Sequence, residues 1–590
     1  MDTMADWTTY ADGSVIPRVA LAAIALTAAT FYTLYLWLLP KPLPGIAYNP
    51  EATKTLWGDE PAMTRYLSAS GEFSSWLGEQ CLRLKSPVAQ IFVQPFQKPW
   101  ILVADFHEIQ DILMRRTDFE KPQFLIDGLA ALGDFHARYK TADQAFRSRR
   151  QLRQDLMAPK FLNGYIGPFS HIKGLQLVEL FEKKADLAQG RPFRVREDYA
   201  RAVLDVMLHH AFGDTWDETA MEPQLELLAS TSPSDISRGG IDEPVAFPEA
   251  PRSFFLKLLH ETAEIMERTT ISPTPQLSFW WWSQQGWFKK IVTERHRVMS
   301  QQLRKAAARF KAGKVESALE HMMMREQAAA EKQGRPARLV SQNMSDEIFA
   351  DPMTGHHTTS SAATWVTKYL TGYPSSQKKL REELYHAFPK AIEQKRVPTF
   401  EELKNAKLPY LEAVIEEARR LTPFVIVREA SQDLEILGRR IPKGSQCLMV
   451  SAGPGITMPS VPVDEDARSP SSKASKPWGK WDESRDLRLF EPERWLVPSG
   501  DGGFDFDATA GPQLGFGMGV RQCWGRRLAQ LIIRTMIALV IWNFEMLELP
   551  EELGGYAGFD GISREPVRAF ARLKKVTPYN LKRVEWNIRK

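Results

Sequence analysis

The hydrophobic positions of this chain predict one long apolar helix near the N-terminus and a mainly helical body after it. Residues 19–39 form an uncharged, mostly apolar run of about 21 residues, which as a helix spans roughly 31 Å, close to one bilayer core. Farther along, apolar residues recur at helical spacing, as Leu528, Leu531 and Ile532 illustrate. Three short apolar runs predict a smaller β-rich part, and they lie at 88–93, 100–103 and 434–437.

The run at 19–39 predicts a transmembrane anchor. A cleaved signal peptide is the alternative, but the run is long for such a peptide, and a proline-rich hinge at 40–45 follows it instead of a small-residue cleavage site. Arg18 and Lys41 flank the run on opposite sides, so the positive-inside rule does not orient it. The expected organisation is an N-terminal segment at 1–18, an anchor at 19–39, a hinge at 40–45 and one large domain at 46–590.

Composition supports a large globular domain in a reducing compartment. The chain has 590 residues, of which 43% are hydrophobic and 25% charged, so it can build a sizeable core. Its formal net charge is +4 with basic residues spread along the chain, which disfavours nucleic-acid binding. Cys81, Cys447 and Cys523 are the only cysteines and form no Cys-x-x-Cys pair, which excludes a disulfide framework and a structural zinc site.

Two polar segments and one aromatic cluster interrupt the helical pattern. The segments at 231–251 and 453–480 predict surface loops. Aromatic residues gather at 279–282 and again at Trp287 and Phe288. This cluster suits a membrane interface or an apolar entrance, and core packing explains it equally well.

Cys523 lies in a glycine-rich segment that begins at Phe516 and runs directly into an apolar helix. Gly519 and Gly525 remove side chains where backbone would pass close to a flat cofactor, and Arg521 supplies a cation for an acidic porphyrin edge. The place of Cys523 near a helix N-terminus favours a thiolate. A buried structural cysteine is the alternative, but the spacing Phe-x-x-Gly-x-Arg-x-Cys-x-Gly is far more restrictive. We therefore predict that Cys523 is the axial ligand of a haem.

Two further segments read as helices that carry polar motifs. Residues 343–370 predict a long helix with Asn343 and Asp346 as candidate N-caps. Pro352 removes a backbone donor, so we expect the following stretch, 354–359, to be bent or unwound. A second helix, between the prolines at 409 and 423, contains two Glu-x-x-Arg pairs, which on spacing alone are ordinary surface pairs.

The segment around Cys523 resembles the haem-binding signature of the cytochrome P450 monooxygenases, and the other motifs follow in that family's order. The resemblance implies that Glu417 and Arg420 form the family's buried Glu-x-x-Arg pair. Arg494, in the Phe-x-Pro-Glu-Arg segment that starts at Phe490, would then complete the network beneath the haem.

The same resemblance assigns the contacts of the haem. Phe516, like Arg521, belongs to the haem-binding signature. Arg150 and Arg428 match arginines that hold the haem propionates, because guanidinium groups suit carboxylates bidentately. Phe146 stands where the family usually has a tryptophan, so one propionate donor is lost.

The stretch 354–359 is similar to the family's Ala/Gly-Gly-x-Asp/Glu-Thr-Thr pattern, where the acid and the next threonine deliver protons to bound oxygen. Thr358 is retained, but His357 stands where the family usually has the carboxylate. A histidine can relay protons near neutral pH, or it can simply be hydrogen-bonded within a bent helix. Both interpretations of His357 stay open.

The resemblance implies a cytochrome P450 fold, which is mainly α with a small β-rich subdomain and, here, an N-terminal transmembrane helix. It implies haem b (iron protoporphyrin IX) as cofactor, in a haem-thiolate monooxygenase domain at 46–590. The enzyme would activate O2 to oxidise a lipophilic small molecule, in a pathway similar to fungal secondary-metabolite biosynthesis. It further implies a single-pass protein of the endoplasmic reticulum membrane whose catalytic domain faces the cytosol.

The electrons would come from another protein, because the chain has neither a Gly-x-Gly-x-x-Gly motif after a strand nor a Walker loop. NADPH would act through an NADPH-cytochrome P450 reductase, with cytochrome b5 as a second candidate partner. Two other functions stay open. One is a haem-thiolate isomerase or dehydratase that needs no external electrons, and the other is a non-enzymatic haem sensor.

Overall fold

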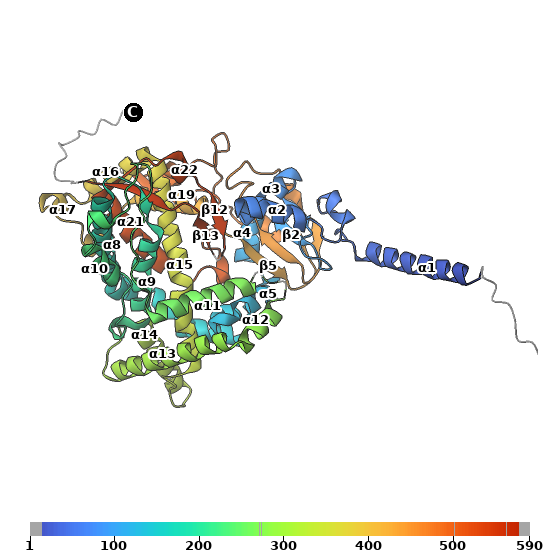
Figure 1. The fold of residues 1–590 in the computed structure, drawn as a ribbon, viewed down its shortest axis with the longest axis horizontal. Coiled ribbons are helices and arrows are strands. Elements are labelled where there is room, and N and C mark those ends of the chain that lie inside the picture. Colours follow the sequence, from blue (N-terminus) through green and yellow to red (C-terminus); the bar gives the residue numbers. More distant parts are fainter. Residues whose placement is uncertain (1–14, 271, 273, 501, 562, 577–590) are drawn as a thin grey trace, which may run out of the picture.

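The computed structural model describes residues 15–270, 272, 274–500, 502–561 and 563–576, and it confirms the mainly helical architecture (Figure 1). Helix α1 (Val15–Leu38) extends away from the rest of the molecule. A β-rich part lies next to it, and the larger helical body lies beyond that part. The long helix α15 (Gln342–Gly372) runs through the middle of the helical body.

The remaining elements follow in chain order. The α-helices are α2 (Glu60–Ser70), α3 (Phe73–Arg83), α4 (Phe106–Met114), α5 (Gln123–Gly128), α6 (Gln144–Leu152), α7 (Pro159–Phe161), α8 (Gly167–Ala188), α9 (Arg196–Phe212), α10 (Glu222–Ala229), α11 (Phe254–Thr270), α12 (Pro275–Gln284), α13 (Gly286–Lys311), α14 (Ala318–Lys332), α16 (Pro374–Ala387), α17 (Pro389–Glu393), α18 (Phe400–Asn405), α19 (Pro409–Arg420), α20 (Pro470–Lys473), α21 (Arg526–Asn543) and α22 (Glu551–Gly554). The strands outside the largest sheet are β4 (Phe193–Arg194), β6 (Leu434–Ile436), β7 (Arg439–Ile441), β9 (Leu496–Pro498), β10 (Phe504–Phe506), β11 (Phe544–Leu547), β12 (Gly558–Asp560), β13 (Arg564–Pro566) and β14 (Phe570–Lys575).

The core of the helical body forms where α15 packs against α9 and α21, while α8 packs against the other sides of α9 and α21. Apolar residues of α21 repeat at helical spacing, and Ile532, Ile537 and Leu539 are fully buried. Trp365 of α15 is buried in the same core. The burial of α15 by neighbouring helices, more than its own helix propensity, therefore stabilises its full length.

The largest sheet has the strand order β1-β2-β8-β5-β3. Its strands are β1 (Val88–Ile91), β2 (Trp100–Val103), β3 (Phe119–Glu120), β5 (Ile426–Ala430) and β8 (Gln446–Met449). Neighbours are antiparallel except β2 and β8, which are parallel with Ile101 opposite Cys447. The runs predicted as strands at 88–93 and 100–103 become β1 and β2. The run at 434–437 becomes β6, which pairs with β7 in a separate hairpin.

The predicted N-caps of α15 are wrong, and so is the predicted unwinding at 354–359. The helix begins after Ser341, whose side chain accepts a hydrogen bond from the Met344 N–H, so Ser341 is the N-cap instead of Asn343 or Asp346. The stretch 354–359 remains within the continuous helix despite Pro352. Packing of α15 between α9 and α21 outweighs the one backbone bond that proline removes.

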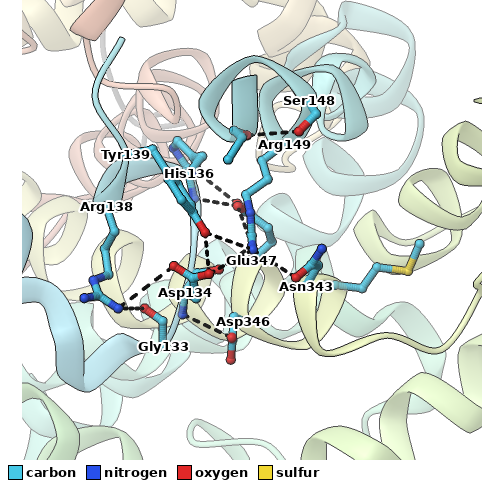
Figure 2. Close-up of polar contacts among 12 residues, drawn as sticks. Gly133, Asp134, His136, Arg138, Tyr139, Ser148, Arg149, Asn343, Asp346 and Glu347 are labelled. Atoms are coloured by element: carbon cyan, nitrogen blue, oxygen red, sulfur yellow. Dashed lines mark hydrogen bonds and ion pairs between the residues drawn. The ribbon is translucent and has the colours of Figure 1, made fainter. Parts of the chain in front are cut away.

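The two residues predicted as caps instead hold a loop against the start of α15 (Figure 2). Asn343 Oδ1 accepts a hydrogen bond from Arg149 at 2.9 Å, and Asp346 Oδ2 accepts one from the Asp134 N–H at 3.1 Å. The neighbouring Glu347 carboxylate accepts from the His136 N–H at 2.5 Å. Side chains of α15 therefore fix the segment that leads into α6.

The N-terminal region contains one helix that could cross a membrane, followed by a short connector. Residues Ala20–Leu38 are long and apolar enough to cross a membrane, with a mean hydropathy of 1.6 and no burial against the rest of the protein. The connector is fastened to the body by Gln90 of β1, whose side chain donates to the Leu43 carbonyl at 2.9 Å and accepts from the Leu43 N–H at 2.8 Å.

Both polar segments are loops for most of their length. The loop at 453–480 packs against α4, where Arg468 pairs with Asp105 at 2.5 Å and Ser471 donates to Asp111 at 2.6 Å. This second loop is therefore a structural part of the β-rich region.

A buried ion pair joins α8 to α9 and so supports the helix that packs on α15. Lys184 Nζ lies 2.8 Å and 2.7 Å from the two carboxylate oxygens of Asp198, and both side chains are almost fully buried. We expect Lys184→Met to lower the free energy of unfolding by about 3 kcal/mol, because among the described residues it leaves the buried carboxylate with Arg201 alone as ionic partner. The matched control is Lys183→Met, which removes a half-exposed pair with Glu179. Denaturant unfolding of both variants measures the two free energies of unfolding. Equal losses of stability in Lys184→Met and Lys183→Met would contradict the prediction.

Candidate active site

The segment around Cys523 is a tight loop that ends at the start of α21. The Cys523 N–H donates to the Phe516 carbonyl at 2.8 Å, which closes the loop. Gly519 adopts a φ of +67°, and a Cβ atom there would lie 2.0 Å from the Leu113 carbonyl of α4. Gly519 is therefore required by the close approach of α4, a reason different from the cofactor contact expected from the sequence. A Cβ atom on Gly525 would meet no protein atom within 4 Å.

Cys523 is the one exposed cysteine, whereas Cys81 and Cys447 are buried. Although Cys523 is accessible, desolvation by the surrounding protein is the largest influence on its thiol and raises its pKa. The Gly525 N–H and the charges of Arg419 and Arg526 act in the opposite direction. The protein alone therefore does not favour the thiolate that the helix position predicted, although these three groups would stabilise one.

Cationic side chains gather beside this loop with few carboxylates to balance them. Arg521 donates to Thr141 Oγ1 at 2.9 Å, and its nearest carboxylate, Glu120, is 3.7 Å away. Burial, followed by repulsion from Arg521 and Arg428, lowers the pKa of Lys121 to about 7. Burial and repulsion from Arg521 lower the pKa of Arg428 to about 10. Arg150 lies 4.2 Å above the ring of Trp524, the residue after Cys523.

This arrangement fits a haem. Mutual repulsion among these half-buried cations suits a site for anionic groups, and the two propionates of a haem supply such charges. Arg150, Arg428 and Arg521 were expected here from the sequence. Lys121 was not, because a single lysine after a two-residue strand carries no distinguishing pattern.

The predicted ion-pair network is brought together by α19 and the segment after Phe490. Arg420 forms a bidentate pair with Glu417 at 2.7 Å and 2.8 Å, and neither side chain is exposed. Arg494 is buried nearby, but its Nε is 3.6 Å from Glu417, so its link to the pair is electrostatic and not a hydrogen bond. Trp495 donates from Nε1 to Glu417 at 2.9 Å, a contact that sequence reasoning missed.

A second buried pair links α19 to the cysteine loop. Arg419 contacts Glu416 at 2.7 Å, and its guanidinium lies 4.0 Å above the ring of Phe516. Arg419 therefore stands between the ion-pair helix and the residue whose carbonyl closes the Cys523 loop.

The central part of α15 carries the predicted oxygen-side residues. Thr358 Oγ1 donates to the Thr354 carbonyl at 2.9 Å, and the His356 Nδ1 contacts the Pro352 carbonyl at 2.5 Å. A Cβ atom on Gly355 would meet the Met207 side chain of α9, so this glycine permits close helix packing.

His357 pairs with a residue that the sequence analysis did not identify. Its Nε2 lies 2.6 Å from Glu565 Oε1 on β13, and Glu565 also pairs with Arg196 at the start of α9. Burial, followed by the charges of Arg196 and His260, lowers the pKa of His357 to about 4, whereas contact with a carboxylate favours the protonated ring. Arg196 already compensates the Glu565 charge, so burial decides the direction and the pKa is lowered.

The aromatic cluster is divided between surface and core. Trp280 and Trp281 are each 56% exposed, whereas Phe288 is buried and Phe279 and Trp282 pack on the core. A cavity of about 400 Å³ lies beside it between α11, α12 and α13, where Leu258, Ile265 and Trp287 contribute to its lining. Core packing therefore explains part of the cluster, and a membrane or entrance role for the two exposed tryptophans stays a prediction.

Comparison with known proteins agrees with this site. A family model described as cytochrome P450 matches residues 92–453 and 488–553. The chain is 35% identical over 574 residues to cytochrome P450 monooxygenase xilC of Penicillium crustosum, covering 95% of this chain and 97% of that protein. It is also 35% identical over 583 residues to cytochrome P450 monooxygenase TRI13 of Fusarium sporotrichioides, covering 94% and 99%.

A crystal structure described as a cytochrome P450 (CYP102L1) superposes with a TM-score of 0.63 at 16% identity, covering 91% of this chain and all of that one. The fold is therefore that of a cytochrome P450. The chain belongs to the cytochrome P450 family and is a P450 monooxygenase.

The Glu417 carboxylate gives a direct test of the network. We expect Glu417→Gln to lower the free energy of unfolding by about 3–5 kcal/mol, because the buried Arg420 guanidinium then lacks a counter-charge. Glu412→Gln on the same helix is the control, since its pair with Arg534 is partly exposed and should contribute about 1 kcal/mol or less. Thermal or denaturant unfolding measures the stability of both variants. Similar losses of stability in Glu417→Gln and Glu412→Gln would show that the buried network contributes no more than a surface pair.

Proposed function

We propose that this protein is a membrane-anchored haem-thiolate monooxygenase that uses O2 to oxidise a lipophilic small molecule. The observation that carries the proposal is the exposed Cys523 in a glycine loop that is flanked by poorly balanced cations. A bound haem would supply thiolate-assisted cleavage of the O–O bond. Membership of the family supports haem as the cofactor.

Each residue of the site then has a role toward the haem. Cys523 would hold the haem iron through its thiolate, and Phe516, Gly519 and Gly525 shape the loop around it. The propionates would be held by Arg150, Arg428 and Arg521 together with Lys121. The Glu417, Arg420 and Arg494 network keeps α19 and its neighbouring segment in place. Thr358 and His357 of α15 manage protons on the oxygen side.

The proposal also covers the electron donor, the membrane location and the kind of pathway. NADPH acts through a cytochrome P450 reductase, and cytochrome b5 is a second candidate donor. The catalytic domain faces the cytosol from the endoplasmic reticulum membrane, with α1 as the anchor and the Pro-rich connector after it. The two relatives described above are fungal monooxygenases, which supports a place in fungal secondary-metabolite biosynthesis.

The reduced, CO-bound absorption spectrum tests the haem-thiolate assignment. We expect wild-type protein to show the red shift that a thiolate ligand causes and Cys523→Ala to lose it, because no other ligand at that position can donate as thiolate does. Cys81→Ala is the matched control and should keep the red shift. The proposal is overturned if the wild-type spectrum lacks the red shift, or if the Cys523→Ala spectrum retains it.

The dependence of turnover on external electrons separates the monooxygenase from the isomerase or dehydratase and from the haem sensor. Consumption of O2 that requires both NADPH and the reductase supports the monooxygenase. Turnover without either would favour the isomerase or dehydratase, and haem binding with no turnover under any condition would favour the sensor.

Removal of residues 1–39 tests the anchor. We expect most of the truncated protein to move from the membrane pellet to the soluble fraction, because the apolar helix is deleted. Residual binding that disappears with Trp280→Ser and Trp281→Ser would assign a membrane contact to α12. Full membrane retention of the truncated protein, with and without the two tryptophan substitutions, would contradict the role of α1 as the anchor.

A further inference from the structure

The second buried ion pair of α19 lies directly behind the cysteine loop. Arg419 Nη1 contacts Glu416 Oε1 at 2.7 Å, and the two side chains are only 7% and 2% exposed. This pair is distinct from the one formed by the next residues, Glu417 and Arg420. Arg419 therefore places a positive charge inside the protein, next to the loop that ends at Cys523.

Glutamine side chains hold this pair against the loop. Gln513 Oε1 accepts from Arg419 Nη2 at 3.2 Å and from the Gly515 N–H at 2.9 Å. The Nε2 groups of Gln513 and of Gln530 on α21 each donate to Glu416 at 3.3 Å. Because α19, the start of the loop and α21 all contribute contacts, the fold fixes the position of the guanidinium relative to the loop.

The guanidinium reaches the cysteine segment across one aromatic ring. Arg419 Cζ is 4.0 Å from the centroid of the Phe516 ring, and the Phe516 carbonyl accepts from the Cys523 N–H at 2.8 Å. A Cβ atom on Gly515 would lie 2.9 Å from Arg419 Nε. The absence of a side chain at Gly515 therefore lets the cation lie against the loop.

The charge of Arg419 acts on the Cys523 sulfur. Burial is the largest influence on the Cys523 thiol and raises its pKa, and among the described residues Arg419 and Arg526 are the cations that oppose this increase. Burial likewise lowers the pKa of Arg419, and Cys523 is one of the groups that raise it. Glu416 is not among the charges that act on the thiol. The positive end of the pair is therefore the end that acts on the sulfur.

Packing alone does not require a charge at this position. Burial of an ion pair costs desolvation, and apolar residues of similar volume often stabilise a protein equally well. Arg419 Nε is also buried without a hydrogen-bond partner among the described residues, which adds to the cost. A buried cation beside Cys523 instead suits a sulfur that carries negative charge, as a thiolate does.

We propose that Arg419 limits the electron donation of the Cys523 thiolate and thereby raises the reduction potential of the haem that this thiolate binds. The cation stabilises negative charge on the sulfur and favours the state that holds one more electron. In this one-electron reduction the electron comes from the external donor, no bond forms or breaks, and Arg419 keeps its proton. Because it acts through the thiolate, Arg419 is a positioning residue. This inference rests on the proposed monooxygenase function.

The reduction potential of the bound haem tests the charge, by spectroscopic titration of the holoenzyme with dithionite. Glu416→Gln combined with Arg419→Gln removes both charges and retains polar amides. We expect the ratio of reduced to oxidised haem at a fixed potential to fall about tenfold, which is a potential about 59 mV more negative for a one-electron couple. Glu416→Gln alone leaves the cation without its counter-charge, so it should shift the potential in the opposite direction.

The matched control removes another ion pair between the same two helices. Glu412 of α19 pairs with Arg534 of α21 at 2.8 Å, beside carbonyls of the segment 403–406. We expect Glu412→Gln combined with Arg534→Gln to leave the potential unchanged. A shift in this control equal to that of the first double variant would overturn the specific role of Arg419.

The reduced, CO-bound form gives a second readout. A more strongly donating thiolate lowers the C–O stretching frequency, so the double glutamine variant should lower it and Glu416→Gln should raise it. Arg419→Lys keeps the charge but loses the planar contact with Phe516, and it should stay near wild type in both readouts. A purely structural role would not move the two glutamine variants in opposite directions.

The outcomes distinguish this inference from the proposed function. An intact thiolate spectrum with wild-type potentials in both glutamine variants would overturn the role of Arg419 alone. If the double glutamine variant binds no haem, Glu416→Met combined with Arg419→Met removes the same charges with apolar packing and should show the same negative shift. An unchanged potential there, or loss of haem from both double variants, would show that the pair only builds the site. Absence of the thiolate spectrum in wild type would overturn the proposed function itself.

Discussion

The ion pair between the buried carboxylate of Glu417 and Arg420 is the interaction on which this architecture depends most. It receives the two guanidinium bonds of Arg420, the indole N–H of Trp495 and the Glu491 N–H at 3.0 Å. Arg420 then donates to the carbonyls of Ile456 and Leu487. One charge pair thereby satisfies polar groups from α19, from the loop after β8 and from the segment near Phe490. These segments have few backbone bonds to one another, so the buried pair fixes their mutual arrangement.

The cysteine loop lies next to this network and depends on it through Arg419. Its own conformation comes from close backbone contacts, with Gly519 against the Leu113 carbonyl and the Cys523 N–H bonded to Phe516. The charges beside the loop are less well satisfied, since burial and like charges lower the pKa of both Lys121 and Arg428. A rigid loop beside cations that outnumber their carboxylate partners is an arrangement that suits an anionic cofactor.

Local spacing was sufficient to predict some of these features and not others. The Cys523 loop and the apolar N-terminal helix are each contained in a short stretch of sequence, so their patterns were visible. The burial of the Glu417–Arg420 pair followed from the family resemblance, because spacing alone indicates a surface pair. Glu565 and Lys121 reach the site through tertiary contacts that no local pattern encodes. The N-cap of α15 was misplaced because Asn343 and Asp346 have the right chemistry but are engaged by Arg149 and Asp134. The expected unwinding of α15 failed for a related reason, since packing by α9 and α21 stabilises the helix more than one proline destabilises it.

The attachment of Leu43 to Gln90 limits how far the protein body can move from its N-terminal helix. Helix α1 ends at Leu38 and the backbone of Leu43 is held by the edge strand β1, so the free connector spans at most about 18 Å even when fully extended. With α1 in a bilayer, as proposed, the domain would rest close to the lipid surface and could not rotate as an independent particle. Substrate dissolved in the membrane would then be met at the concentration it reaches in lipid, and poor solubility in water would not limit its supply.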